Sequence, residues 1–170
     1  MQEIRARIDR LGTMPVTVNQ LESDEKADEG IVVGAAISPC FERGDLIRIA
    51  QTRRWKLIVS TSWQESAILM RNRTVPVVLL HRSLLEPDWR QALRTILTAS
   101  ARPSALVISP DTSNSFWEAV IRLGGYDVLP TPLSETQVVH AVQAAWKFWR
   151  RCRAPFYGDR PTSADSSFAG

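Results

Sequence analysis

The sequence is poor in residues that hold metals or disulfides. Its 170 residues include only two cysteines, Cys40 and Cys152, and two histidines. There is no CxxC pair, and neither cysteine lies in a histidine cluster. The sequence therefore lacks the ligands for a zinc site and the cysteines for a disulfide framework. We therefore expect reduced thiols, no metal site and no cofactor.

Long apolar runs are also absent. No run reaches the roughly 20 residues that a helix needs to cross a bilayer. Residues 1–10 alternate charged and apolar side chains, in contrast to the apolar stretch of a signal peptide. These features predict a cytoplasmic protein with no membrane partner.

The excess of positive charge is small, with 21 Lys and Arg against 18 Asp and Glu and a net charge of +3. Much of it lies in Arg53, Arg54, Lys56, Arg71, Arg73, Arg150, Arg151 and Arg153. This weak charge favours solvated surfaces over a nucleic-acid interface. Neither GxGxxG nor GxxxxGK[ST] follows the first apolar run, which argues against a nucleotide-binding loop.

The chain contains one candidate domain between two polar ends. Residues 1–29 close with the acidic run 22–29 and have too few apolar side chains to form a core, so they are interpreted as a flexible extension. The stretch from 152 to 170 is interpreted as a flexible tail. Residues 30–151 remain as the folded domain.

Within this domain, short apolar runs alternate with segments of helical period. The predicted strands are 31–37, 56–60, 75–80, 105–109 and 126–129, and the predicted helices are 41–52, 63–71, 87–99, 115–123 and 134–151. Nearly continuous apolar strands are typical of a parallel sheet that is buried on both faces. We expect an α/β doubly wound fold, in which functional groups gather at the carboxyl ends of the strands.

Two stretches resemble the receiver domains of bacterial response regulators. They are PVVLLHRSLLEPDWRQAL at 76–93 and LGGYDVLPTPLSETQVVHAVQAAWKFW at 123–149. The second has Thr-Pro-Leu where family members usually have Lys-Pro-Phe. The resemblance implies a five-stranded sheet in the flavodoxin-like order 2-1-3-4-5 and a role in two-component signal transduction.

A working receiver needs an acidic pair after the first strand for Mg²⁺, an Asp that ends the third, a hydroxyl that ends the fourth and a Lys that ends the fifth. Matched to that pattern, the positions here are Gly34 and Ala35 with Ala36, then His81 with Ser83 two residues later, Ser109, and Thr131. Only the hydroxyl of Ser109 is retained. The resemblance therefore implies a degenerate receiver, or pseudo-receiver, that is independent of phosphorylation.

The notable polar residues also have plain structural interpretations. His81 has no second histidine nearby, which favours incidental placement at a strand end. Ser109 and Asp111 lie in a Ser-Pro-Asp-Thr-Ser stretch that is typical of a turn and a helix N-cap. The receiver resemblance implies a cis peptide at Thr131-Pro132. Glu86 and Asp88 are expected to open the following helix.

The last predicted helix has a broad apolar stripe that includes Trp146 and Trp149, with Phe148 away from its centre. We expect a partner or a second copy to bind at the helices 115–123 and 134–151, through the two tryptophans. The expected function is a non-enzymatic interaction module. The alternative is a small-molecule-binding or enzymatic domain that uses the strand-end crevice around His81, Ser109 and Thr131. A DNA-binding regulator is disfavoured because no helix-turn-helix module follows.

Overall fold

The computed structural model describes residues 30–37, 43–99 and 102–153. The predicted flexible extension at 1–29 lies outside these residues, as does the predicted tail of 152–170 beyond residue 153. The strands are β1 (Val32–Ala36), β2 (Lys56–Ser60), β3 (Val77–His81), β4 (Ser104–Ser109) and β5 (Asp127–Pro130). The helices are α3 (Arg43–Thr52), α4 (Trp63–Asn72), the 3₁₀ helix η1 (Arg82–Leu85), α5 (Trp89–Leu97), α6 (Asn114–Arg122) and α7 (Glu135–Arg153). Every predicted strand and helix is present, and η1 was not predicted.

The five strands form one parallel sheet in the order β2-β1-β3-β4-β5, which confirms the predicted topology. In the register of the sheet, Ala36 lies beside Leu80, His81 beside Ile108, and Ser109 beside Pro130. The carboxyl ends of β1, β3, β4 and β5 are therefore nearly level, so the loops that follow them share one edge.

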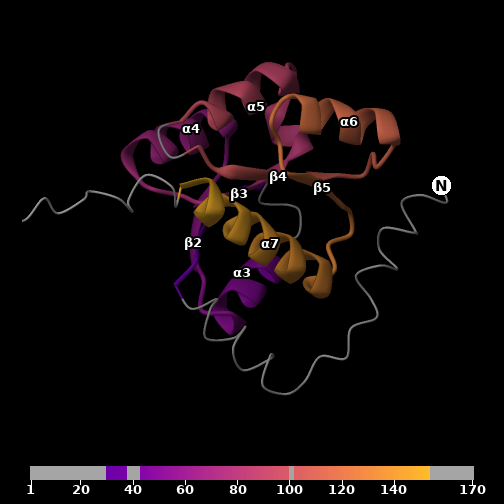
Figure 1. The fold of residues 1–170 in the computed structure, drawn as a ribbon. Helices are drawn as coiled ribbons and strands as arrows, with labels where there is room; N and C mark the ends of the chain where they lie inside the picture. Colours follow the sequence, from indigo (N-terminus) through magenta and orange to yellow (C-terminus); the bar gives the residue numbers. More distant parts are fainter. Residues whose placement is uncertain (1–29, 38–42, 100–101, 154–170) are drawn as a thin grey trace, which may run out of the picture.

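Helices cover both faces of the sheet. In Figure 1, α3 and α7 lie on one face, and α4, α5 and α6 lie on the other. All residues of β3 and β4 are buried, and their side chains alternate between two apolar clusters. One cluster includes Leu79 and Leu106 with Val142 of α7, and the other includes Leu80 and Val107 with Leu93 of α5. The two faces of the sheet thus pack into two separate halves of the core.

Short polar residues fix where the helices begin. Ser62 accepts a hydrogen bond from the Glu65 amide at 3.1 Å, and Asp88 accepts one from the Gln91 amide at 3.0 Å. These N-caps satisfy amides that the helix itself leaves unpaired. Asp88 therefore opens α5, as predicted. The last helix, α7, continues to Arg153, two residues beyond its predicted end at 151. No described helix is both long and apolar enough to cross a membrane.

The end of α6 depends on two adjacent glycines. The amides of Gly124 and Gly125 donate to the carbonyls of Ile121 and Val120, both at 2.9 Å, which is the pattern of a Schellman motif. Gly124 has a φ of +96°, a conformation that side chains disfavour. A Cβ on Gly125 would lie 2.5 Å from Cγ1 of Val120 and 3.0 Å from its carbonyl oxygen. This turn aims the chain into β5.

We predict that Gly125→Ala destabilises the domain by about 1–3 kcal/mol, the usual range for an overpacked core site. Gly44→Ala is the matched control, because a Cβ at exposed Gly44 in the first turn of α3 would meet no atom within 4 Å. It should be neutral or stabilising by up to about 1 kcal/mol, since alanine favours the helix. Urea unfolding monitored by circular dichroism measures both. Equal stability of the two variants would contradict the packing argument.

Candidate functional site

The carboxyl edge of the sheet brings together three of the positions singled out in the sequence. His81 ends β3, Ser109 ends β4, and Thr131 follows β5 directly. Ser83 lies just beyond His81, in η1. The peptide bond between Thr131 and Pro132 is cis, as the resemblance implied. His81 thus ends the third strand, as the sequence motif placed it, and Thr131 comes one residue after the end of the fifth.

The expected acidic-pair position needs a correction. Gly34 and Ala35 were matched to the end of the first strand, but Gly34 is the third residue of β1 and both lie within the strand. Because Ala36 pairs with Leu80, the residues level with His81 are Ala36 and Ile37. The match was wrong because a run of small apolar residues gives no signal of where a strand ends. Ala36 and Ile37 also carry no oxygen ligand.

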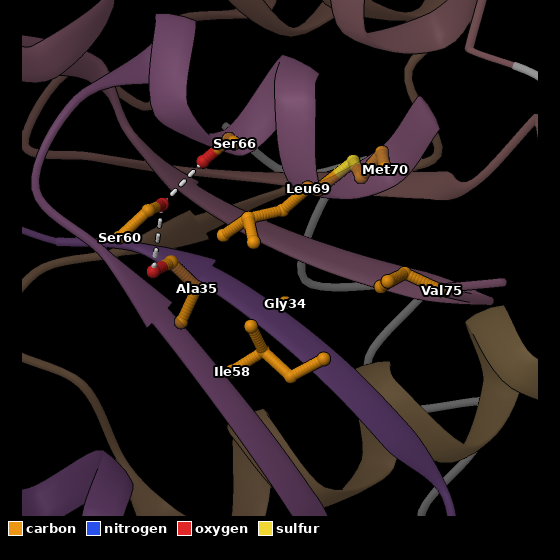
Figure 2. Close-up of a pocket in the computed structure, with 8 residues that line it drawn as sticks. All are labelled: Gly34, Ala35, Ile58, Ser60, Ser66, Leu69, Met70 and Val75. Atoms are coloured by element: carbon orange, nitrogen blue, oxygen red, sulfur yellow. Dashed lines mark hydrogen bonds between the residues drawn. The ribbon is translucent and has the colours of Figure 1, made fainter. Parts of the chain in front are cut away.

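Gly34 has a packing role instead. A Cβ there would lie 3.1 Å from Cε of Met70 and 3.2 Å from Cγ1 of Val75. Figure 2 shows the small pocket that Gly34 lines between β1, β2 and α4, together with Ala35, Ile58, Ser60, Ser66, Leu69, Met70 and Val75. Ser60 and Ser66 hydrogen-bond to each other at one end of it. The pocket has no room for a water molecule, so it is a packing feature and not a ligand site.

The His81 side chain is 7% exposed and is engaged by its own loop. Its Nδ1 lies 2.7 Å from Oγ of Ser83 and accepts the Ser83 amide at 3.3 Å. These contacts make His81 the N-cap of η1. Because the Nδ1 lone pair of His81 already accepts the hydrogen bond from the Ser83 amide, Nδ1 is not free to bind a metal or a substrate. This arrangement supports the structural interpretation of His81.

Ser109 likewise belongs to a chain of turn hydrogen bonds. Its fully buried Oγ accepts the Asp111 amide at 3.0 Å, and Oδ1 of Asp111 accepts the Ser113 amide at 3.0 Å. Ser113 in turn caps α6 by accepting the Phe116 amide. The predicted turn and N-cap are confirmed, with Ser113 as the cap. The hydroxyl of Ser109 is used to shape the β4–α6 loop.

Arg82 is the residue of this edge that sequence reasoning missed. Its guanidinium pairs with Asp111 at 3.2 Å and with Glu86 at 3.7 Å, and it lies 4.4 Å from the ring centroid of Phe116. Phe116 packs edge-on against Trp89 of α5. Arg82 therefore ties the loop after β3 to the loop after β4 and to two helices. An available signal was the opposite charge of Arg82 and Asp111 just after two apolar strands.

The electrostatics of Asp111 follow from these contacts. Hydrogen bonds from the Ser113 amide and hydroxyl, and then the Arg82 guanidinium, stabilise the carboxylate and lower the pKa of Asp111 below its ordinary value of 3.8. The carboxylate is therefore held in its charged form by the loop that it organises.

The described residues at this edge do not fit a magnesium ion. Mg²⁺ requires hard oxygen ligands in octahedral geometry, and carboxylates usually supply them. Ala36 and Ile37 carry none, and His81 replaces the carboxylate at the end of β3. Across the part of the chain that the structure describes, no three His, Cys, Asp or Glu side chains gather in a way that could hold a metal. The position of Thr131 provides a hydroxyl where the family pattern has an ammonium.

The aromatic residues of α7 differ in their exposure to solvent. Trp146 and Trp149 are both half-buried, and Trp146 packs against the core beneath the guanidinium of Arg150. Phe148 is 51% exposed, with its ring 5.3 Å from that of Tyr126. The most exposed aromatic of the helix is therefore Phe148, because it lies off the apolar stripe. Together, α6, β5 and α7 form one side of the domain, which we call the α6–β5–α7 face.

Comparisons with known proteins agree on the architecture. No family model matches the chain, and no curated protein does. Solved structures do match it. The receiver domain of sensor histidine kinase PA1611 from Pseudomonas aeruginosa aligns with a TM-score of 0.61 and 12% identity over 69% of this chain and 98% of that one. The chain has the receiver fold.

Other solved structures align with the chain to a similar degree. The signal receiver domain of an HD domain-containing protein from Pseudomonas fluorescens aligns with a TM-score of 0.64 and 15% identity, over 83% of this chain and 96% of that one. A putative CpaE2 pilus assembly protein from Sinorhizobium meliloti aligns with a TM-score of 0.58 and 18% identity, over 68% and 99%. The PA1611 domain is described with a magnesium ion in its active-site cleft. At these identities the likeness establishes the fold alone.

We predict that Asp111→Asn lowers stability at neutral pH and that this loss shrinks in acid. Because the folded pKa of Asp111 is lowered, its charge stabilises the fold above the unfolded value, and this contribution disappears as pH falls through the folded pKa. Asparagine keeps an oxygen acceptor for Ser113 but not the charge. Urea midpoints of both proteins at pH 7 and pH 3 provide the measurement. A difference of equal size at both values would contradict a role for the charge.

Proposed function

We propose that this chain is a non-catalytic receiver-like module of signal transduction that acts by binding a protein, independently of phosphorylation. The observation that carries the proposal is the Arg82 network at the carboxyl edge of the sheet. Arg82 joins the ends of β3 and β4 through Asp111 and packs on Phe116 of α6. An internal ion pair thus links loops that a transferred phosphoryl group would otherwise have to organise.

The chemistry of the edge supports the same proposal. In phosphoryl transfer to a carboxylate, a metal and an ammonium must offset the charge of the group. Here Ala36, His81 and Thr131 stand at the strand ends. The alternative function, a small-molecule or enzymatic site around His81, Ser109 and Thr131, loses support because His81 and Ser109 already hydrogen-bond within their own turns. They form no nucleophile, base and orienting set.

The proposed binding surface is the α6–β5–α7 face. It carries the exposed ring of Phe148, the half-buried Trp146 and Trp149, and Tyr126 at the start of β5. Aromatic side chains in such positions are favoured anchors at protein interfaces, because they bury large area at low entropic cost. Through α6, this face is also connected to Phe116 and the Arg82 network. We propose that a signalling partner or a second copy binds here.

Incubation of the protein with acetyl phosphate and Mg²⁺ should leave its intact mass unchanged. The His81→Asp variant should behave in the same way, because the metal ligands and the ammonium would still be missing. A phosphorylatable receiver domain treated in parallel confirms that the donor is active. A gain of one phosphoryl group on the unmodified chain, removed by hydroxylamine, would overturn phosphorylation independence.

Phe148→Ser should weaken association about tenfold, the effect expected for loss of one aromatic anchor worth about 1.4 kcal/mol. Ile68→Ser is the matched control, because Ile68 is 58% exposed on α4, away from the α6–β5–α7 face. Sedimentation equilibrium measures self-association, and pull-down from the native cell measures partner binding. Weakening by Ile68→Ser with no effect of Phe148→Ser would place the interface elsewhere.

A further inference from the structure

Positive charge gathers at the opposite edge of the sheet, where the strands begin. The loops before β2, β3 and β4, the first residue of β2 and the last turn of α4 supply a set that we call the basic end: Arg53, Arg54, Lys56, Arg71, Arg73 and Arg102. All except Arg53 are exposed. Within the part of the chain that the structure describes, the exposed Lys56, Arg71, Arg73 and Arg102 of this set form no ion pair, and the paired arginines Arg48, Arg82 and Arg122 lie outside it.

The strand starts are held level by backbone hydrogen bonds. The Lys56 amide donates to Ile31 at 2.8 Å, the Gly30 amide to Arg54 at 3.3 Å, and the Ser104 amide to Pro76 at 2.8 Å. Because neighbouring strands lie about 4.8 Å apart, β2 and β4 are separated by about 15 Å across three spacings. The basic end is therefore one compact surface, with the start of β1 between β2 and β3.

An acidic segment of the chain enters the fold at this point. Residues 22–29 contain five Asp and Glu and one Lys, and they are followed directly by Gly30, which precedes β1. Residues 30–153 instead carry sixteen Lys and Arg and nine Asp and Glu. An extended segment of eight residues reaches about 29 Å at most, which exceeds the width of the basic end. The acidic run can thus reach every member of the set.

Tethering makes this charge complementarity effective. A single exposed ion pair contributes little, but a segment joined directly to the surface has an effective concentration on the order of millimolar, and several pairs can form together.

We propose that the acidic run at residues 22–29 binds back on the basic end and forms ion pairs with its arginines. The occupant of this surface is then a segment of the same chain. Bound there, the run shields the arginines from anionic macromolecules and holds the N-terminal segment against the domain. This inference uses the edge opposite to the Arg82 network, and it is independent of the proposed function.

Labelling of arginines with phenylglyoxal in the full chain, followed by mass spectrometry, tests the proposal. The test variant is Asp24→Asn/Glu25→Gln/Asp28→Asn/Glu29→Gln. The matched control removes four carboxylates outside the run: Glu3→Gln/Asp9→Asn/Asp159→Asn/Asp165→Asn. At low salt, labelling of Arg71, Arg73 and Arg102 should be at least threefold faster in the test variant and unchanged in the control. Arg122, which pairs with Glu118, is the internal reference.

Salt and heparin distinguish the possible occupants. At 0.5 M NaCl the unmodified protein should label at the rate of the test variant, because salt screens exposed ion pairs. Heparin should protect the arginines more strongly in the test variant than in the unmodified protein. Equal labelling of test variant and control at low salt would overturn the proposal. Equal protection of both proteins by heparin would also overturn it, and would indicate an external polyanion as the occupant.

Discussion

The burial of β3 and β4 on both faces is the constraint from which the other features follow. Every residue of these strands is inaccessible, and the side chains of each strand pack alternately against α7 on one face and α5 on the other. Polar side chains in these two strands occur only at their ends, at His81, Ser104 and Ser109, because buried polar groups need partners that apolar neighbours cannot supply. The other polar groups near these strands lie in the loops at the two edges of the sheet, and the two edges differ in charge.

At the carboxyl edge, the polar side chains form hydrogen bonds that shape turns and cap helices. The β4–α6 loop is shaped by successive hydrogen bonds among Ser109, Asp111 and Ser113, and Ser113 caps α6. His81 caps η1 in the same way. Arg82 then joins the two loops. In this arrangement, the hydrogen bonds join residues two or three positions apart, and the Arg82–Asp111 pair joins the loops of two neighbouring strands. The loops at this edge are thus ordered by hydrogen bonds and an ion pair among their own residues.

Much of the fold could be predicted from the sequence because its signals are local. The strand Lys56–Ser60 was predicted with the bounds that the structure shows, and the cap of α5 follows from Asp88 and its neighbours. Contacts between residues far apart in the sequence were missed. The Arg82–Asp111 pair spans 29 residues, and its geometry requires the register of β3 and β4. The position of Gly34 within β1 depends on pairing with β2 and β3, which a run of small apolar residues does not reveal.

The topology also sorts charge between the two edges. Each helix that joins two strands starts near the carboxyl ends and finishes near the starts of the strands. Acidic residues in first turns, such as Asp45, Glu65 and Glu135, complement the positive ends of the helix dipoles, and Arg71 and Arg122 in last turns complement the negative ends. At the carboxyl edge, arginines neutralise much of this acid: Arg48 pairs with Asp45 and Glu135. The loops before β2, β3 and β4 add more cations and no acidic residue. Because acidic side chains favour helix starts and basic side chains favour helix ends, positive and negative charge offset each other at the carboxyl edge, whereas the opposite edge is positively charged.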